Sequence, residues 1–332
     1  MQLLSVIVPV YGVERFIERC SRSLFAQTYP DLEFVFVDDA TPDRSIGILQ
    51  SVMEDYPERK EMVRIVSHDR NRGLAASRNT GLIHASGDFV ICVDSDDWLE
   101  EDAVMQLAQK QSESNADIVQ GAYMVHESDG SRVWTGSHCT DRDGAVLQMM
   151  QRTWDHFVAG RLIRRTLFTS NGLRWTEGLD VAEDRCMMTM LAYYARKTDA
   201  IDNVVYHYER RNDHALTSAT RARNDIRNQR QELGNLLQLE HFFADKETVF
   251  RDACSRCVTE ELRNSLQLAV KHSDRDEYYR IVSMIDGRRD EDLQWIGWSK
   301  GVKGWIKHRY GYIILSRSVA AFFKAIKEKF GA

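Results

Sequence analysis

The sequence lacks any apolar run that approaches the roughly 20 residues of a membrane-spanning helix. It also lacks a basic segment before its first apolar stretch, and that stretch is short and ends at Pro9. We therefore interpret the first residues as a strand and not as a signal peptide. Neither repeats nor low-complexity tracts occur, so the 332 residues are expected to form one large domain, or one domain plus an extension.

An excess of positive charge is also missing. The formal net charge of −6 argues against general binding of nucleic acid. The exception is the segment 300–332, in which eight basic residues face a single acid, Glu328, and alternate with aromatic and aliphatic residues. Two interpretations of this tail stay open: a basic amphipathic stretch on an anionic membrane face, or an ordinary docking helix with a solvated basic face.

The six cysteines are scattered and show no disulfide pattern. Cys92 lies inside an apolar run, so free thiols in a reducing, cytoplasmic compartment are expected. Cys254 and Cys257 form a C-x-x-C, a spacing that can mark zinc or redox chemistry. No second C-x-x-C or suitably spaced histidine pair completes a zinc site, and the surrounding pattern predicts a helix.

The first 125 residues alternate between two patterns. Short apolar runs typical of buried strands cover residues 3–10, 34–37, 63–66 and 89–93, and segments with helical spacing lie between them. Strands buried on both faces and separated by helices predict an α/β fold with a mainly parallel sheet flanked by helices. Beyond about residue 222 the apolar spacing is helical, which predicts a helical C-terminal extension.

Polar residues follow three of these strands. Tyr11, the pair Asp38-Asp39 and the run 94–97 each stand where an apolar run stops. Ligands of parallel α/β sheets bind beyond the carboxyl ends of the strands, so these residues are expected to converge on one crevice.

The most informative segment is Asp94-Ser95-Asp96-Asp97-Trp98. Three carboxylates at the end of a buried strand are costly unless a cation meets them, and a divalent metal with hard oxygen ligands is the simplest partner. A metal with open coordination positions at a strand end commonly binds phosphate oxygens. The segment therefore predicts a metal-diphosphate site, and with it transfer chemistry on a nucleotide-linked substrate. The alternative is that Asp96 or Asp97 only caps the helix that begins near Glu101.

Four ordered motifs resemble glycosyltransferase family 2. They are SVIVPVY at 5–11, VDDATPD at 37–43, RNRGLAASRN at 70–79 and VDSDDW at 93–98. Each motif alone is weak, but four in this order and spacing are specific together. The strong resemblance covers about residues 3–125, and a weaker one continues to about residue 220. It implies the GT-A fold, a nucleoside-diphosphate sugar donor, Mn²⁺ or Mg²⁺, and inversion at the anomeric carbon.

The resemblance also implies the residues that hold the donor. Asp96 corresponds to the metal-binding acid, and Asp94 to an acid near the ribose and a metal-bound water. Asp39 corresponds to the acid that hydrogen-bonds the pyrimidine base, and because a carboxylate accepts the N3–H of uracil, UDP is the favoured carrier. The full set of implied nucleotide contacts is Pro9, Val10, Tyr11, Asp39, Arg78, Asp94 and Ser95. Asp39 can instead cap a helix, and Arg78 can instead pair with Asp94 or Asp39 as a structural ion pair.

The resemblance places a catalytic base in the Glu183-Asp184 pair, which precedes an apolar helix. Inversion by single displacement needs a base that deprotonates the acceptor hydroxyl opposite the leaving diphosphate. Asp184 is the preferred candidate and Glu183 the second, with Asp180 outside the motif as a third. The alternative is that these first-turn acids only complement the helix dipole.

The run 206–211, followed by His214 and Thr217-Ser218, resembles the loop that closes over the diphosphate in this family. Within it His207, Arg210 and Arg211 are candidate contacts, although Glu209 interrupts the usual order. Tryptophan faces suit the C–H faces of a pyranose, so Trp98 is a further candidate contact, with Trp154 and Trp175 as weaker ones. The alternative for each of them is a place in the core.

These observations predict an inverting, metal-dependent glycosyltransferase that uses a nucleoside-diphosphate sugar, with UDP the favoured carrier. Its acceptor would be a glycan or a lipid-linked glycan in cell-surface polysaccharide synthesis, in the cytoplasm at the inner face of the plasma membrane. The expected organisation is a catalytic domain at 1–221, with a nucleotide half at 1–125 and an acceptor half at 126–221, followed by a helical region at 222–332.

Two alternatives remain. A sugar-nucleotide pyrophosphorylase needs a glycine-rich, arginine-containing loop after the first strand, and the segment 12–15 is not such a loop. A non-catalytic protein of the same fold would bind the nucleotide sugar without turnover.

Overall fold

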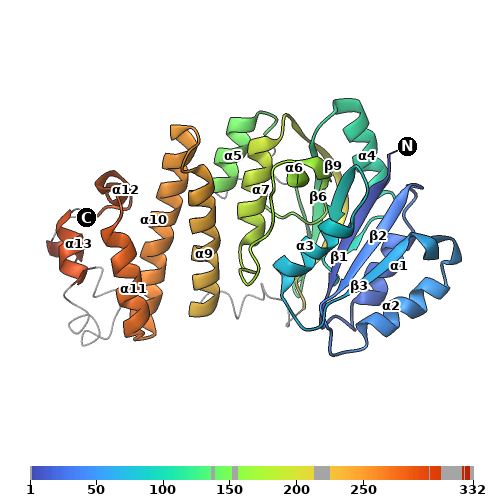
Figure 1. The fold of residues 1–332 in the computed structure, drawn as a ribbon, viewed down its shortest axis with the longest axis horizontal. Coiled ribbons are helices and arrows are strands. Elements are labelled where there is room, and N and C mark those ends of the chain that lie inside the picture. The colour runs from blue at the N-terminus through green and yellow to red at the C-terminus, as the bar shows by residue number, and fades with distance from the viewer. Residues whose placement is uncertain are drawn as a thin grey trace. The chain divides into compact units, whose positions relative to one another are not determined.

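A computed structural model describes residues 2–135, 139–151, 156–212, 225–298, 300–307, 324 and 326–329. The chain divides into two compact units, Met1–Ser218 and Ala219–Ala332 (Figure 1). The first unit is built around a sheet, and the second consists of helices in its described part.

The sheet of the first unit is mixed. Its strand order is β3-β2-β1-β4-β8-β6-β9-β5, and β7 pairs with β6. The N-terminal strands β1 to β4 are parallel to one another, whereas β8 is antiparallel to both β4 and β6. The predicted α/β fold, a sheet flanked by helices, is thus confirmed. The sheet is parallel in its N-terminal half, as expected, and mixed in its C-terminal half. The strands are β1 (Leu4–Val10), β2 (Leu32–Asp38), β3 (Val63–Ser67), β4 (Phe89–Cys92), β5 (Trp98–Leu99), β6 (Ile118–Glu127), β7 (Gly130–Trp134), β8 (Leu162–Arg164) and β9 (Thr198–Glu209).

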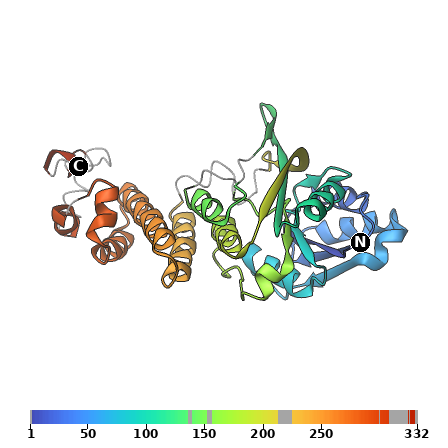
Figure 2. The same cartoon turned by 90° about the horizontal axis from the view of Figure 1, so that it is seen from above.

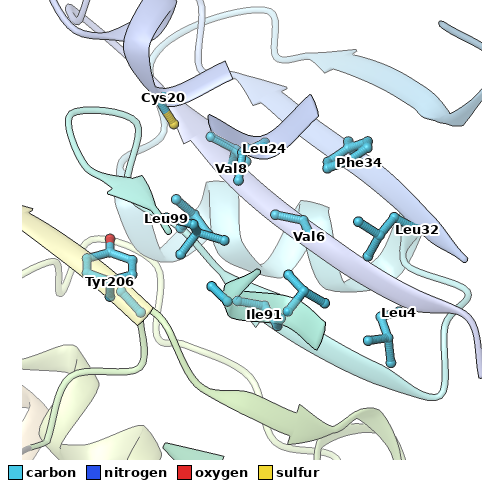
Figure 3. Close-up of a cluster of buried hydrophobic side chains, with 14 of the residues drawn as sticks. Leu4, Val6, Val8, Cys20, Leu24, Leu32, Phe34, Ile91, Leu99 and Tyr206 are labelled. Carbon is cyan, nitrogen blue, oxygen red and sulfur yellow. The ribbon is translucent and has the colours of Figure 1, made fainter. Parts of the chain in front are cut away.

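Helices cover both faces of this sheet: β1 is buried at every position, and its side chains alternate in direction. Val6 and Val8 point toward Leu24 of α1, in the hydrophobic core drawn in Figure 3. Ile7 points the other way, where a side chain at Gly81 of α3 would collide with it. The helices of this unit are α1 (Ile17–Phe25), α2 (Ser45–Glu54), the short 3₁₀ helix η1 (Pro57–Met62), α3 (Leu74–His84), α4 (Ala103–Ser114), α5 (Arg142–Met150), α6 (Arg165–Thr169) and α7 (Glu183–Tyr194).

The second unit contains α9 (Ile226–Phe243), α10 (Thr248–Lys271), α11 (Arg275–Asp286), α12 (Asp290–Trp295) and α13 (Lys300–Lys307). The helical extension predicted from the sequence is confirmed. Cys254 and Cys257 both lie within α10, in agreement with the helical interpretation of this C-x-x-C. None of the described helices combines the length and the apolar character needed to cross a membrane. Most of the basic tail after Lys307 lies outside the described residues.

Candidate active site

The loop that follows β4 carries the acidic cluster, and β9 fixes its position. Tyr206 of β9 accepts a hydrogen bond from the main-chain N–H of Asp94 at 3.1 Å and donates its hydroxyl to Asp97 Oδ2 at 2.6 Å. The second oxygen of Asp97 accepts the N–H of Glu209 at 2.7 Å. Asp97 is only 1% exposed, and burial, followed by repulsion from Asp96 and Asp94, raises its pKa well above the usual range.

Asp97 therefore anchors the loop to the sheet instead of facing a ligand. It does not cap the following helix either, because the residue before α4 is Asp102, which makes no side-chain cap bond. The sequence interpretation gave ligand roles to Asp94 and Asp96 and only a possible helix cap to Asp97. The structure shows Asp97 as a buried anchor and leaves Asp94 and Asp96 partly exposed.

Asp96 has few partners for a carboxylate in such surroundings. Its Oδ2 accepts a hydrogen bond from Asn212 Nδ2 at 2.8 Å. Burial, and next the negative charge of Asp94, raises the pKa of Asp96 to about 6. An opposite charge brought close to Asp96 would offset both effects.

One buried arginine joins three acids that are distant in the sequence. Arg78 lies in α3, is 1% exposed, and donates through Nη2 to Asp94 Oδ1 at 3.1 Å. Through Nη1 it donates to Glu183 Oε1 and Asp184 Oδ1, both at 2.6 Å. The ion pair between Arg78 and Asp94, which the sequence left open as an alternative, is therefore observed. Arg78 also pairs with Glu183 and Asp184 of α7, which the sequence did not predict.

The acid pair stands in the first turn of α7, where both side chains are buried. The main-chain N–H of Val158 donates to the second oxygen of Asp184 at 3.1 Å. Burial, and then repulsion by Asp184, raises the pKa of Glu183 to about 8, although Arg78 opposes the shift. Two acids so close to one guanidinium form a site in which a proton can be held or released near neutral pH.

Asp39 lies at the carboxyl end of β2, beside the end of β1, where its N–H donates to the carbonyl of Val10 at 3.0 Å. Its carboxylate is buried and accepts the N–H groups of Arg72 and Gly73, each at 2.8 Å, while His68 Nδ1 lies 2.7 Å from it. Gly73 has a φ of +91°, and a side chain there would collide with Asp180. Asp39 thus shapes the turn before α3.

The other predicted nucleotide contacts lie at the same edge of the sheet. Pro9 and Val10 are buried at the end of β1, and Tyr11 is 49% exposed directly after it. Ser95 is buried within the loop that carries Asp94. The structure therefore brings together the strand ends that the sequence singled out.

Asp180 also acts on the start of α3. Its Oδ1 accepts the N–H of Ala75 at 2.7 Å, so it satisfies a main-chain donor in the first turn of that helix. Burial raises its pKa.

The predicted diphosphate loop pairs its arginines with glutamates. Arg211 donates to both oxygens of Glu209, each at 2.6 Å, and Arg210 donates to Glu127 at 2.7 Å. Burial alone would raise the pKa of Glu209, but hydrogen bonds from Arg211 and Arg19 outweigh it and lower the pKa to about 2. His214, Thr217 and Ser218, predicted as part of the same loop, lie outside the described residues.

Trp98 stacks on protein groups. Its ring lies 4.7 Å from the ring of His207 and 4.6 Å from that of His126, and the guanidinium of Arg19 lies 3.5 Å from its centroid. His207 also lies 2.7 Å from Glu100 Oε1. Of the other candidates for sugar stacking, Trp175 is buried in the core at 4% exposure, and Trp154 lies outside the described residues.

The interpretation of the sequence missed three residues that hold this site together, Arg19, Val158 and Asn212, and gave Asp97 no role other than a possible helix cap. Three of the four bonds use main-chain atoms, and all four join residues at least 26 positions apart in the sequence. Such bonds depend on tertiary packing, which a single sequence does not display.

The residues present fit a divalent metal shared with a ligand. Among the described residues, no group of three or more His, Cys, Asp or Glu is arranged to hold a metal alone. Mg²⁺ and similar ions often take only one or two carboxylates and complete their shell with substrate phosphates and water. Asp96, with its raised pKa and its partial exposure, suits this arrangement.

Comparison with known proteins identifies the family. The family model described as glycosyl transferase family 2 matches residues 5–172. The uncharacterized glycosyltransferase EpsJ of Bacillus subtilis is 32% identical over 225 residues, which make up 65% of this chain and 63% of EpsJ. The chain belongs to glycosyltransferase family 2, a family of sugar-transferring enzymes, and the resemblance seen in the sequence is confirmed.

Solved structures support the same fold. Residues 1–349 of Staphylococcus aureus TarS, in complex with UDP-GlcNAc, superpose with a TM-score of 0.66 at 20% identity, covering 97% of this chain and 92% of that one. In sequence, TarS, named poly(ribitol-phosphate) beta-N-acetylglucosaminyltransferase, is 26% identical over 85% of this chain and 49% of its own length. The mannosyltransferase PcManGT of Pyrobaculum calidifontis, in complex with GDP-Man and Mn²⁺, gives a TM-score of 0.55 at 16% identity, covering 99% of this chain and 88% of that one. The predicted GT-A fold is confirmed.

Proposed function

We propose that this protein is an inverting, divalent-metal-dependent glycosyltransferase. It moves a sugar from a nucleoside-diphosphate donor, with UDP the favoured carrier, to a glycan or lipid-linked acceptor in cell-surface polysaccharide synthesis. The observation that carries the proposal is the cluster around Arg78, which joins Asp94 of the acidic loop to Glu183 and Asp184 of α7. The donor side and the acceptor side of a transfer reaction would meet at this cluster.

The donor nucleotide would lie across the ends of β1 and β2. Pro9, Val10 and Tyr11 would contact it from one side, and Asp39 would accept a hydrogen bond from the base. Asp94, Ser95 and Arg78 would lie nearer the ribose and the diphosphate. The UDP-GlcNAc and GDP-Man bound by two proteins of the same fold support a nucleotide-sugar donor, and uracil recognition by Asp39 favours UDP.

Asp96 would hold Mn²⁺ or Mg²⁺ together with oxygens of the diphosphate. When bound, the ion acts as a Lewis acid that offsets the charge gained by the leaving nucleoside diphosphate. Arg210 and Arg211 would exchange their glutamate partners for phosphate oxygens as the donor binds, while the stack of Trp98 and His207 supports that loop.

Asp184 would accept the proton of the acceptor hydroxyl. Glu183 has a pKa of about 8 and holds a proton at neutral pH, so it is the weaker candidate. Arg78 and the N–H of Val158 fix the orientation of the Asp184 carboxylate, which is what a general base needs for an in-line displacement.

The cellular setting is part of the proposal. A polysaccharide-building enzyme with lipid-linked acceptors would work in the cytoplasm at the inner face of the plasma membrane, with the basic tail as a peripheral contact. Sedimentation of the full chain with vesicles of anionic lipid, but not with vesicles of zwitterionic lipid, would support this contact. Equal recovery with both vesicle types would argue against it.

Donor hydrolysis tests the proposal directly. The full chain, incubated with a panel of UDP- and GDP-sugars, is expected to release nucleoside diphosphate with Mn²⁺ or Mg²⁺ and to stop when the metal is chelated. Asp96→Asn should abolish the metal-stimulated rate. Asp88→Asn is the matched control, because Asp88 is exposed and precedes β4, whereas Asp96 follows it.

The outcomes separate the alternatives. Full metal-stimulated hydrolysis by Asp96→Asn would overturn the metal assignment. Binding of the nucleotide sugar without turnover would indicate a non-catalytic protein of this fold. Formation of a nucleoside triphosphate from the sugar nucleotide and pyrophosphate would indicate a pyrophosphorylase.

A further inference from the structure

Aromatic rings form a row across three neighbouring strands of the catalytic unit. Trp134 of β7 is the direct cross-strand partner of Tyr123 of β6, and Tyr123 is in turn the partner of Tyr206 of β9. Directly paired side chains lie on the same face of a sheet, so these three rings share one face. Tyr206 and Tyr123 are in contact, with ring centroids 5.5 Å apart.

Phe157 connects the row. Its ring centroid lies 6.1 Å from that of Tyr123, 5.6 Å from that of Trp134 and 5.4 Å from that of Tyr208. Exposure increases along the row. Tyr206 and Tyr123 are 1% and 2% exposed, Phe157 and Tyr208 are half-buried, and Trp134 is 39% exposed. The row therefore begins in the core beside the acidic loop and ends at the surface.

The segment that carries Phe157 also holds the proposed base. The N–H of Val158 donates to Asp184 Oδ2 at 3.1 Å, and the carbonyl of Ala159 accepts the Tyr123 hydroxyl at 2.9 Å. Phe157 precedes Val158, so its Cα lies about 3.8 Å from that of the residue bonded to the base. An aromatic surface is thus built into the same short segment as the group that would receive the acceptor's proton.

The hairpin of β6 and β7 projects from the rest of the sheet (Figure 2). All five residues of β7 are exposed. A single exposed apolar residue on a protein surface needs no explanation. Trp134, however, continues a row of packed rings, and it stands on a projecting strand, where an exposed apolar side chain favours unwanted association with other chains. A large aromatic side chain in that position indicates a ligand.

The charges of the hairpin indicate what kind of ligand. Arg132 and Arg210 both donate to Glu127, at 3.2 and 2.7 Å, and Asp129 stands in the turn between the strands. Within the hairpin itself Arg132 is thus outnumbered by Glu127 and Asp129, which favours an uncharged partner over a phosphate-bearing one. The C–H face of a pyranose carries slight positive charge and suits the negative face of an aromatic ring.

We propose that Trp134, supported by Phe157 and Tyr208, forms an acceptor subsite in which the face of the Trp134 ring stacks on the apolar face of a pyranose. The Phe157 ring stands at 88° to that of Trp134 and therefore supports it edge to face. This inference rests on the proposed transferase function and deepens it, because it assigns the class of acceptor: a neutral, pyranose-containing saccharide. The subsite orients a sugar beside Asp184, and none of its three residues belongs to the proposed donor contacts at the ends of β1 and β2 and in the loop after β4.

The test compares Trp134→Ala with two matched variants. Val133→Ala removes an apolar residue that is 53% exposed and precedes Trp134 in β7, so it points to the opposite face. Trp134→Phe keeps an aromatic ring. The readouts are binding of neutral pyranose oligosaccharides by saturation-transfer NMR, transfer to the same oligosaccharides, and donor hydrolysis without acceptor.

Trp134→Ala is expected to weaken saccharide binding and to raise the acceptor KM by about five- to tenfold. Donor hydrolysis should stay within about twofold of the wild-type rate, Val133→Ala should resemble the wild type, and Trp134→Phe should recover most of the affinity. Unchanged saccharide binding in Trp134→Ala would overturn the subsite, as would an equal loss of donor hydrolysis, which would mean a structural role.

The two proposals fail separately. If the wild type turns over a donor but binds no pyranose oligosaccharide, the subsite is wrong and the transferase function stands. If oligosaccharides bind through Trp134 but no nucleotide sugar is turned over, the transferase function is wrong and saccharide binding stands.

Discussion

Both units of the chain bury arginine beside carboxylates, but with a different balance of charge. In the first unit a single guanidinium, that of Arg78, faces three acids. In the helical unit Arg288 pairs with Glu240 at 2.6 Å, and Arg289 pairs with Asp292 at 2.9 Å and Asp252 at 3.0 Å. Three arginines and two acids line a cavity of about 400 Å³ in this unit, so cations are not outnumbered there.

This difference in charge balance distinguishes the Arg78 cluster, a candidate functional site, from the Arg288–Arg289 cluster, which we interpret as a scaffold that stabilises the helical unit. The match is closest around Arg289, whereas burial raises the pKa of Glu240, the partner of Arg288. Burial alone would raise the pKa of Asp292, but hydrogen bonds from Arg289 and Ser255 outweigh it and lower the pKa. The Arg78 cluster instead leaves acid in excess, and the pKa of Glu183 rises. An unsatisfied cluster costs stability and is commonly retained where protons or cations are handled.

The largest expected effect is on turnover. Asp184→Asn keeps the shape of the side chain but removes the proposed base, so transfer should fall by about 10²- to 10⁴-fold. Asp292→Asn, the matched change in the helical unit, should leave turnover within about twofold. Initial rates of nucleoside diphosphate release with acceptor present give the comparison. Should Asp184→Asn keep more than a tenth of the wild-type rate, the base lies elsewhere.

The next effect is on stability. Arg78→Met leaves three acids without their shared cation, and breaking such a buried pair costs about 3–5 kcal/mol. Arg288→Met should cost less, about 1–3 kcal/mol, because its partner Glu240 is 25% exposed and can reach water. Urea unfolding of both variants measures the difference in free energy. A larger loss of unfolding free energy for Arg288→Met than for Arg78→Met would contradict the assignment of the Arg78 cluster as the site and of the Arg288 cluster as the scaffold.

The smallest effect is on the pH dependence of stability, and it has opposite signs in the two units. The pKa of Glu183 is raised from its ordinary value of 4.5 to about 8, so its contribution to stability is full below about pH 4.5 and is lost as the pH rises to about 8. The pKa of Asp292 is lowered from 3.8, so its contribution is full above that pH and is lost in more acidic solution.

Glu183→Gln should therefore flatten the decline in unfolding free energy between pH 5 and pH 8, and Asp292→Asn should flatten the decline below about pH 4. Thermal unfolding across this pH range gives both curves. If the two substitutions shift the curves over the same pH interval, the contrast between the clusters does not hold.

The sequence was informative where a rule links position to place. Strand ends of a parallel sheet meet at one edge, so the convergence of Val10, Asp39 and Asp94 followed from the pattern of apolar runs. The pairing of Arg78 with Asp94 was one of two alternatives left open, and the structure shows it. Family resemblance, and no physical rule, supplied the pair in α7.

It was less informative where a role depends on distant packing. Asp97 stands in the same acidic run as Asp96, and only its hydrogen bonds with Tyr206 and Glu209 of β9 make it an anchor. No sequence pattern singled out Trp134, because a lone tryptophan in a polar segment gives no periodic signal. Its place in an aromatic row arises from the pairing of β7 with β6, which a single sequence does not specify.

The short segment from Phe157 to Gly160 limits how the proposed saccharide preference of this chain can be changed by substitution. Gly160 has a φ of +69°, and any side chain there would come within 2.6 Å of the Tyr206 ring. The segment therefore has no room for a larger residue at this position. Redesign at Phe157 would disturb the proposed general base along with the proposed saccharide contact. Trp134, at the exposed end of the row, is therefore the position at which a change of saccharide preference is expected to leave the proposed base in place.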